Sequence, residues 1–314
     1  MKIKRLETIL VKEFLFLRIY TDDGLIGLGE AGLMSKTKTV EAAIRELERY
    51  LVGKDPLQIE YHWQHMYRTP FFRGGPVLNS AISAVDIALW DIAGKHFDVP
   101  VYQLLGGKCR EKVRVYVHIG GRTPEELAES AVIASKRGFT AVRFAPFIEG
   151  EFQRMRYSRL IEMAESQVKS VRKAVGYDID ICLDAHGRLS PYEAIAMARA
   201  LEKYKPFFFE DPILPENIDV MADIAAHTHI PIATGERLYT IYEFAHLLSK
   251  RAVHMVRPDI SIAGGISQCK KIASMAEAYY VGVVPHSPFS PVMVAASVQF
   301  YTSIHLRLQY TLVK

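Results

Sequence analysis

Three short stretches decide the fold: Asp178-Ile-Asp-Ile-Cys-Leu-Asp184, Pro206-Phe-Phe-Phe-Glu210 and Pro231-Ile-Ala-Thr-Gly-Glu236. Each is an apolar run that ends at an acidic residue close to Gly or Pro. The intervals 210 − 184 and 236 − 210 are both 26 residues, about one strand plus one helix of a parallel α/β fold. The equal spacing predicts that the three acids lie at the same end of three successive strands.

Three carboxylates at one end of a barrel would repel one another and raise each other's pKa values. A hard divalent cation removes that conflict, and an all-oxygen set with room for water and substrate suits Mg²⁺. Asp184, Glu210 and Glu236 are therefore the predicted metal ligands. The alternative is that these acids cap helices or pair with Arg.

Composition narrows the class of protein. The chain has 314 residues, 49% of them hydrophobic, so a globular fold is expected. Its net charge is +4 and it has no basic runs, so binding to nucleic acid is not expected. Three widely spaced cysteines without a CxxC motif fit a reduced, cytoplasmic protein. The N-terminus lacks a signal-peptide core, and no uninterrupted apolar run has the roughly 20 residues of a membrane span.

Residues 1–110 are expected to form a small α+β domain. The strand Phe14–Tyr20, a turn at Thr21-Asp-Asp-Gly24 and the strand Leu25–Glu30 indicate a hairpin, and helices are expected at 39–51 and 80–95. The aromatic and Arg-rich segment between them, which includes Arg73, is either a loop that closes over a ligand or an ordinary packed connection.

Residues 111–314 repeat strand and helix. The expected strands are 113–119, 141–146, 179–184, 207–210, 232–236, 254–260, 281–286 and 306–312, with helices near 123–137, 157–175, 190–203, 216–226, 240–249, 265–279 and 290–303. This pattern predicts an α/β fold of the modified TIM-barrel type, with seven βα units and an eighth strand. A barrel that stops at Lys314 looks short at its C-terminal end.

Two further strand ends carry groups that could move protons. Asp259 follows the sixth strand and His286 ends the seventh, so an Asp would orient the imidazole and make it a general base. His186 lies two residues after Asp184 and would face the same cavity in extended chain. Arg143, on the second strand, would be a fixed cation toward an anionic substrate. Arg237 and Arg257 are alternatively ion-pair partners of the acids.

The residues resemble the enolase superfamily, in its mandelate racemase group. Four stretches look like the galactonate dehydratase family: Phe72–Pro76, Asp184–Arg188, Ala233–Arg237 and Pro258–Gly265. The resemblance implies a capping domain at 1–110, a barrel at 111–314 and a homo-oligomer. It also implies that Asp184, Glu210 and Glu236 bind Mg²⁺, that His286 with Asp259 removes a proton, and that His186 protonates a leaving hydroxyl.

The expected reaction is the dehydration of a sugar acid, an aldonate or aldarate, to a 2-keto-3-deoxy acid. Arg143, Arg73 and Arg237 are the expected substrate-binding residues. The family usually has Lys where this chain has Arg143, and that change disfavours two-base racemisation. It usually also has a Glu on strand eight, where this chain reads Leu308-Gln-Tyr-Thr. The alternatives are a racemase or epimerase of a carboxylate substrate, or a catalytically silent, truncated homologue.

Overall fold

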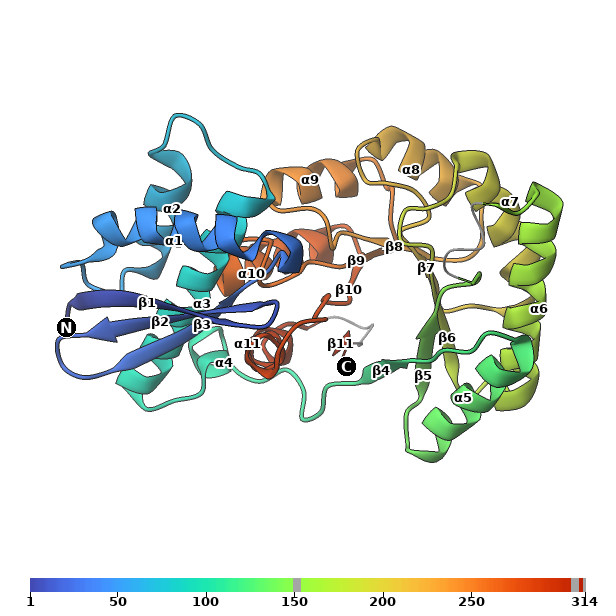
Figure 1. Cartoon of the computed structure of the whole chain (residues 1–314), viewed down its shortest axis with the longest axis horizontal. Coiled ribbons are helices and arrows are strands. Elements are labelled where there is room, and N and C mark those ends of the chain that lie inside the picture. The colour runs from blue at the N-terminus through green and yellow to red at the C-terminus, as the bar shows by residue number, and fades with distance from the viewer. Residues whose placement is uncertain (149–153, 306–310, 313–314) are drawn as a thin grey trace. The chain divides into compact units, whose positions relative to one another are not determined.

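The computed structural model describes residues 1–148, 154–305 and 311–312, with only the backbone for the last two. These residues form two compact units, whose elements are labelled in Figure 1. Of the described residues, the first unit contains 1–113, 236–245 and 258–305, and the second contains the others.

The first unit begins with an antiparallel sheet in the order β1-β2-β3. Its strands are β1 (Ile3–Val11), β2 (Phe14–Thr21) and β3 (Ile26–Ala31). Along β2, Leu15, Leu17 and Ile19 are buried and alternate with more exposed residues, as expected for a sheet that covers a core on one face. The predicted hairpin turn is present, with Gly24 at φ +92°.

Helices pack on this sheet. They are α1 (Thr37–Leu51), α2 (Ile59–Arg68), α3 (Pro76–Phe97) and α4 (Val101–Leu104), with a short 3₁₀ turn at Met34–Lys36. The contact between β3 and α3 depends on two glycines, because a Cβ on Gly27 would lie 2.2 Å from Ala88 O and one on Gly29 would lie 2.0 Å from Ala84 O. Any side chain at either position would push the helix backbone away from the strand.

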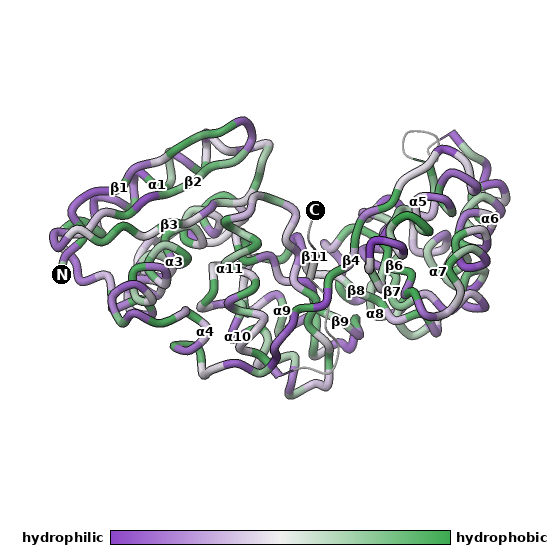
Figure 2. Tube along the Cα trace, turned by 90° about the horizontal axis from the view of Figure 1, so that it is seen from below, coloured by the Kyte–Doolittle hydropathy of each residue, from purple (hydrophilic) through white to green (hydrophobic). Residues whose placement is uncertain are grey.

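Helix α3 is the longest helix in the described part of the first unit and contains many apolar residues (Figure 2). Its length and composition would allow it to cross a membrane. However, 78% of its most apolar 18-residue segment is buried inside the protein. The sequence-based expectation concerned an unbroken apolar run, which α3 is not, because polar residues such as Asn79 and Ser83 interrupt it. This burial is typical of a core helix.

Two buried acids bind the N-terminal part of the first unit to its later helices, α10 (Gly265–Ala278) and α11 (Pro291–Thr302). Asp86 on α3 accepts hydrogen bonds from Ser267 N (3.0 Å) and Ser267 Oγ (2.5 Å) in the first turn of α10. Glu30 on β3 accepts from Ser290 and from Met293 N at the start of α11. Both carboxylates supply partners for amides that a helix leaves unpaired at its N-terminus.

The second unit contains a curled parallel sheet with helices between its strands. Within this unit the strands of the sheet have the order β9-β8-β7-β6-β5-β4-β11. Its strands are β4 (Val115–His118), β5 (Ala141–Phe144), β6 (Asp180–Asp184), β7 (Phe208–Glu210), β8 (Ile232–Thr234), β9 (Met255–Val256) and β11 (Thr311–Leu312). The helices are α5 (Pro124–Lys136), α6 (Tyr157–Val175), α7 (Pro191–Leu201) and α8 (Ile218–Ala226), with a 3₁₀ turn at Glu202–Tyr204 and with α9 (Ile241–Ser249) crossing from one unit to the other.

Helix starts follow the local sequence. Thr123 and Ser190 precede Pro124 and Pro191, and each side chain accepts a hydrogen bond from the backbone amide three residues later. Ser190 and Glu193 form a complete capping box. These caps explain why the predicted starts of the two helices agree with the observed ones.

The α/β class, with an N-terminal antiparallel sheet and a parallel barrel-like sheet, is confirmed. Most strands are shorter than expected, since only two to five residues of β4–β9 pair as strands. The seventh predicted strand is reduced to β10 (Gly282–Val283), and β1 was missed as a separate strand. The eighth predicted strand lies largely outside the described residues, although Thr311 and Leu312 pair in parallel with β4.

Candidate active site

Two of the three predicted metal ligands end adjacent strands. Asp184 is the last residue of β6 and Glu210 the last of β7, and the two pair in register. Both are fully buried. The chain turns sharply after each acid, with His186 at φ +52° and Asp211 at φ +40°. The register confirms that equal spacing in sequence placed these two acids at the same strand edge.

Arg143 on β5 lies between these acids. It forms an ion pair with Asp184, and its Nε is 3.5 Å from Glu210 Oε2. Its other nitrogens approach His118 Nε2 at 3.1 Å and His186 Nε2 at 3.2 Å. Only 7% of the Arg143 side chain is exposed, so this guanidinium balances buried negative charge as well as facing the strand ends.

Arg257 supplies a second cation and is fully buried. It forms an ion pair with Glu210 Oε1, and its Nη2 donates a 2.7 Å hydrogen bond to the hydroxyl of Tyr116 on β4. The rings of Tyr116 and Phe208 lie 5.7 and 5.6 Å from the guanidinium carbon. Burial raises the pKa of the Tyr116 hydroxyl, so this group stays neutral.

The donor set of Asp184 and Glu210 suits a hard cation. Asp184 Oδ2 and both Glu210 oxygens are buried and accept no hydrogen bond within the described part of the chain, so charged partners alone compensate them. Within that part, no three His, Cys, Asp or Glu side chains are gathered as a metal site. Glu236, the third predicted ligand, belongs to the first unit.

The first unit holds the predicted base. His286 Nδ1 lies 2.7 Å from Asp259 Oδ2, and because a carboxylate only accepts, Nδ1 carries the proton. Asp259 Oδ1 accepts from Ser261 N at 2.8 Å and Ser261 Oγ at 2.7 Å, which fixes the orientation of this buried carboxylate. His286 Nε2 is 3.1 Å from Glu236 Oε2. This unit therefore places Glu236, Asp259 and His286 side by side.

His186 lies close to Asp184 for a different reason from the expected one. The alternation of extended chain does not apply, because His186 has a left-handed backbone. Its amide instead donates a 2.7 Å hydrogen bond to Asp184 Oδ1, and its Nε2 is 3.1 Å from Asp184 Oδ2. The side chain remains 38% exposed. A tight turn therefore folds the imidazole back over the carboxylate.

The other predicted arginines lie in the first unit. Arg237 Nε is 3.6 Å from Glu236 Oε1, so the alternative of an ion pair within this dipeptide is observed. Arg73 is exposed in the loop after α2, with its guanidinium 5.9 Å from the centre of the Tyr67 ring. His118 and Tyr116 were not among the site residues predicted from the sequence. The only signal was their position on β4, where alternate residues share one face.

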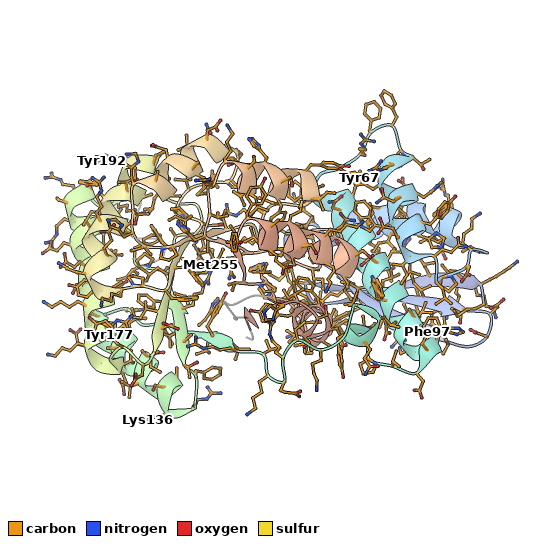
Figure 3. The ribbon with its side chains drawn as sticks, turned by 180° about the vertical axis from the view of Figure 1, so that it is seen from behind. Tyr67, Phe97, Lys136, Tyr177, Tyr192 and Met255 are labelled. Atoms are coloured by element: carbon orange, nitrogen blue, oxygen red, sulfur yellow. The ribbon has the colours of Figure 1, made fainter. Side chains whose placement is uncertain are left out.

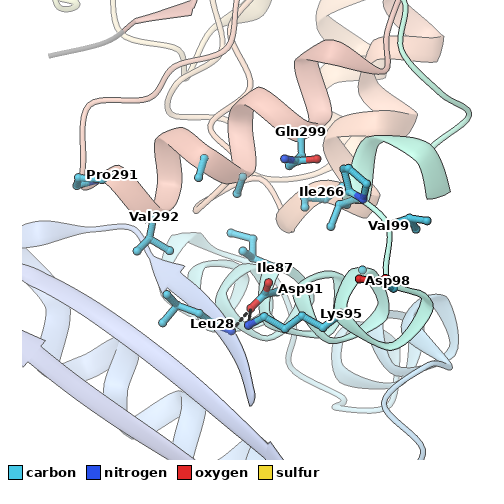
Figure 4. A pocket seen from close by; sticks show the side chains of 15 residues that line it. Leu28, Ile87, Asp91, Lys95, Asp98, Val99, Ile266, Pro291, Val292 and Gln299 are labelled. Carbon is cyan, nitrogen blue, oxygen red and sulfur yellow. Dashed lines mark hydrogen bonds and ion pairs between the residues drawn. The ribbon is translucent and has the colours of Figure 1, made fainter. Parts of the chain in front are cut away.

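A cavity of about 630 Å³ in the first unit contains none of the predicted site residues. It is bounded by β3, α3, α10 and α11, and its wall is mostly apolar, with Ile87, Ile266 and Val292 (Figure 4). An ion pair between Asp91 and Lys95, at 2.7 Å, lies at its edge. Its lining therefore shares no residue with the candidate active site.

The family of the chain follows from its matches. Residues 4–106 match the mandelate racemase / muconate lactonizing enzyme N-terminal domain, and residues 126–312 match the enolase C-terminal domain-like family. The chain therefore belongs to the mandelate racemase group of the enolase superfamily.

Curated relatives place the chain more narrowly. It is 44% identical over 300 residues to the D-galactonate dehydratase of Ralstonia pickettii, covering 94% of this chain and 77% of that one. The D-galactonate dehydratase of Cronobacter sakazakii is equally similar over the same shares. These relatives are hydro-lyases, and the expected enzyme class is confirmed.

Solved structures agree in fold. An enolase from Agrobacterium radiobacter, with bound sodium and L-malate, has a TM-score of 0.95 at 33% identity and covers 100% of this chain and 81% of that one. A member of the enolase superfamily from Salmonella Typhimurium has a TM-score of 0.94 at 30% identity, with coverage of 99% and 86%.

Proposed function

We propose that this protein dehydrates a sugar acid, an aldonate or aldarate, to the 2-keto-3-deoxy acid. The observation that carries the proposal is the Asp259–His286 pair, in which the 2.7 Å contact places a proton on Nδ1 and makes Nε2 the nitrogen that is proposed to exchange a proton with the substrate. The D-galactonate dehydratases among its relatives support the same reaction class.

The proposed reaction begins with removal of the proton on the carbon next to the substrate carboxylate. That proton is weakly acidic, because its loss places a second negative charge on the carboxylate. His286 Nε2 accepts it, and the buried Asp259 stabilises the imidazolium that forms. Ser261 holds Asp259 with two hydrogen bonds, so the pair needs no rearrangement before the step.

Asp184, Glu210 and Glu236 are the proposed Mg²⁺ ligands. Bound there, Mg²⁺ would act as a Lewis acid that stabilises negative charge on the substrate carboxylate. Arg143 and Arg257 balance the negative charge of the buried Asp184 and Glu210 through ion pairs.

His186 is the proposed general acid. After proton removal the bond from the β-carbon to its hydroxyl breaks, and a proton from His186 lets the hydroxyl leave as water. The resulting enol tautomerises to the 2-keto acid. The 38% exposure of His186 leaves one side of the ring accessible to a substrate. Arg143, 3.2 Å from His186, is the proposed cation for the substrate carboxylate, and Arg73 and Arg237 remain predicted substrate-binding residues.

The remaining proposals concern the substrate, the cellular location and the domains of the protein. The partner is a small carboxylate, and D-galactonate is the first substrate to test. We propose a cytoplasmic enzyme, a setting that the free thiols of Cys109, Cys182 and Cys269 suit. We also propose that 1–110 acts as a capping domain and 111–314 as the catalytic domain, in line with the two family matches.

The test is a screen of purified protein with Mg²⁺ against aldonic and aldaric acids, with semicarbazide detection of 2-keto acids. On the substrate found, His286→Asn should lower kcat by about 10²–10⁴-fold, the usual contribution of a general base. Glu210→Gln should weaken Mg²⁺ binding in calorimetry by at least about 10-fold, since even outer-shell partners of a metal contribute that much.

Two controls separate the alternatives. His286→Asn should retain Mg²⁺ affinity, which shows that its loss of activity comes from proton transfer. Solvent deuterium that enters recovered substrate without keto acid would instead indicate a racemase or epimerase. Near-full activity of either variant would contradict the assignment of its residue, and folded, Mg²⁺-binding protein without any product would support the silent homologue.

A further inference from the structure

The proposed base and the acid that orients it lie on two separate segments of the first unit. Asp259 precedes α10 and His286 precedes α11. The two backbones meet at one bridge, in which His286 N donates to Pro258 O at 3.2 Å. Ser287, the residue after His286, is joined to α11 by a 2.6 Å hydrogen bond with Ser297. The contact between His286 Nδ1 and Asp259 Oδ2 therefore depends on where α11 lies.

One buried acid at the end of β3 holds the start of α11. Glu30 is fully buried, and its carboxylate accepts hydrogen bonds from Ser290 N at 3.1 Å, from Ser290 Oγ and from Met293 N at 2.9 Å. These donors lie in the first turn of α11, and this helix lies beside β3 in the first unit (Figure 3). Because His286 is only four residues before Ser290, Glu30 fixes the segment that bears the proposed base.

The same strand end also holds the segment of Asp259. Gly32 directly follows β3 and donates its amide to Ser261 O at 3.0 Å. Ser261 in turn donates two hydrogen bonds to Asp259 Oδ1. A Cβ at position 32 would lie 3.0 Å from Ser261 Oγ and 2.5 Å from Ile262 Cγ1, so the fit leaves no space for a side chain. One strand end thus supports the segments of both Asp259 and His286.

The donors that meet at Glu30 require a carboxylate. Two of them are backbone amides at the N-terminus of a helix, where negative charge is favourable. Each carboxylate oxygen accepts from one of these amides, so a glutamine would place its NH₂ group against Ser290 N or against Met293 N. Two donors that face each other in a buried site cost free energy. Glu30→Gln should therefore displace the start of α11.

We propose that the end of β3 positions the proton-transfer pair formed by Asp259 and His286. Glu30 acts on His286 through α11, and Gly32 acts on Asp259 through Ser261. This inference rests on the proposed function, in which His286 is the base. The two residues set the geometry of the pair and transfer no proton themselves. A displacement of about 1 Å caused by a residue remote from the reacting atoms can lower a rate about 100-fold.

Nuclear magnetic resonance of ¹⁵N-histidine-labelled protein with Mg²⁺ tests the positioning without any substrate. The Nδ1 proton of His286 should exchange slowly with water, because Asp259 accepts it and only 16% of the His286 side chain is exposed. Its loss in His286→Asn assigns the resonance. Glu30→Gln should shift this resonance upfield or remove it through faster exchange. Asp91→Asn is the matched control, since Asp91 accepts a 2.8 Å hydrogen bond from Leu28 N in the same unit, and it should leave the resonance unchanged.

Gly32→Ala tests the second contact and decides the question if Glu30→Gln does not fold. Its methyl group should press on Ser261 Oγ and so shift the His286 resonance as well. On the substrate found by the screen, each folded variant should lower kcat by about 10–100-fold and change KM by less than about 2-fold, because the geometry of the pair matters in the transition state. Asp91→Asn should leave both constants unchanged.

The outcomes separate the positioning from the reaction. Circular dichroism first establishes that each variant is folded. An unchanged His286 resonance in either folded variant, an equal change in Asp91→Asn, or the absence of a slowly exchanging His286 proton from wild-type protein would overturn the proposal. An unchanged kcat in a variant whose resonance has shifted would overturn it too. Shifted resonances in protein that dehydrates no sugar acid would support the positioning and contradict the proposed function.

Discussion

Replacement of Asp86 by Asn should stabilise the protein at neutral pH and have a smaller effect in acid. Asp86 is fully buried on α3, and desolvation raises the pKa of its carboxyl from the ordinary 3.8 to about 7, although Ser267 donates two hydrogen bonds to it. An Asn at this position can accept from Ser267 N and donate to Ser267 Oγ. It therefore imitates the protonated acid at every pH.

The sign follows from proton linkage. Between pH 3.8 and about 7 the folded state holds the Asp86 proton that the unfolded state has lost, so the free energy of unfolding falls as pH rises through this window. At about 1.4 kcal/mol per pKa unit, the full window corresponds to about 4 kcal/mol. The Asn variant has no carboxyl group to ionise at this position, so its free energy of unfolding does not fall in this way. Its advantage over wild type should therefore grow from pH 4 to pH 7 and stay constant above.

Urea denaturation at pH 4.5, 6 and 8, followed by circular dichroism and tryptophan fluorescence, measures this difference. Asp91→Asn is the matched control, since Asp91 lies on the same helix with its side chain 33% exposed and pairs with Lys95. Loss of such a surface pair should change stability by about 1 kcal/mol or less at each pH. A difference between Asp86→Asn and wild type that stays flat from pH 4.5 to 8 would refute the reasoning. In that case the helix N-terminus and Ser267 offset the desolvation of the carboxylate.

Two further predictions concern buried contacts and use the same assay at pH 7. Arg257→Leu should destabilise the folded protein by about 3–5 kcal/mol, because it removes a buried cation from Glu210. Adding Glu210→Leu should recover part of that lost stability. An effect of the single variant below about 1 kcal/mol would contradict a buried ion pair at this position. Gly29→Ala should cost at least about 1–3 kcal/mol, since its Cβ would meet Ala84 O, whereas Gly120→Ala has no atom within 4 Å and should be nearly neutral. Equal effects of the two alanines would show that β3 and α3 can separate without cost.

The two units contribute different parts of the proposed chemistry. The second unit contains Asp184 and Glu210 with the arginines that balance them, and the first contains Glu236, Asp259 and His286. In each unit the acidic groups are held by partners that come from other strands or loops. The first unit therefore contains the proposed base and one proposed metal ligand, and the second contains the proposed general acid His186 and the other two metal ligands.

Much of this organisation was predictable from local sequence. Strand and helix alternate because apolar runs and capped amphipathic segments have their own periods, and Thr123 and Ser190 mark helix starts through hydrogen bonds within one turn. The constant interval of 26 residues placed Asp184 and Glu210 in register, and the succession of strand ends brought Asp259 beside His286. These features depend on short stretches of chain and on the regular geometry of parallel strands.

Tertiary structure decided the rest. Arg257 reaches Glu210 and Tyr116, which are 47 and 141 residues away in sequence, and Asp86 reaches Ser267 across 181 residues. No local pattern predicts which buried charges will meet, because the pairing depends on how whole elements pack and on which groups lose water together. The position of His186 was likewise not predicted correctly from local sequence. Its side chain approaches Asp184 because of a left-handed turn and not because of the alternation of a strand. The sequence by itself determined the order of the elements and the strand ends that bear acids, whereas only packing determined the cations that balance them.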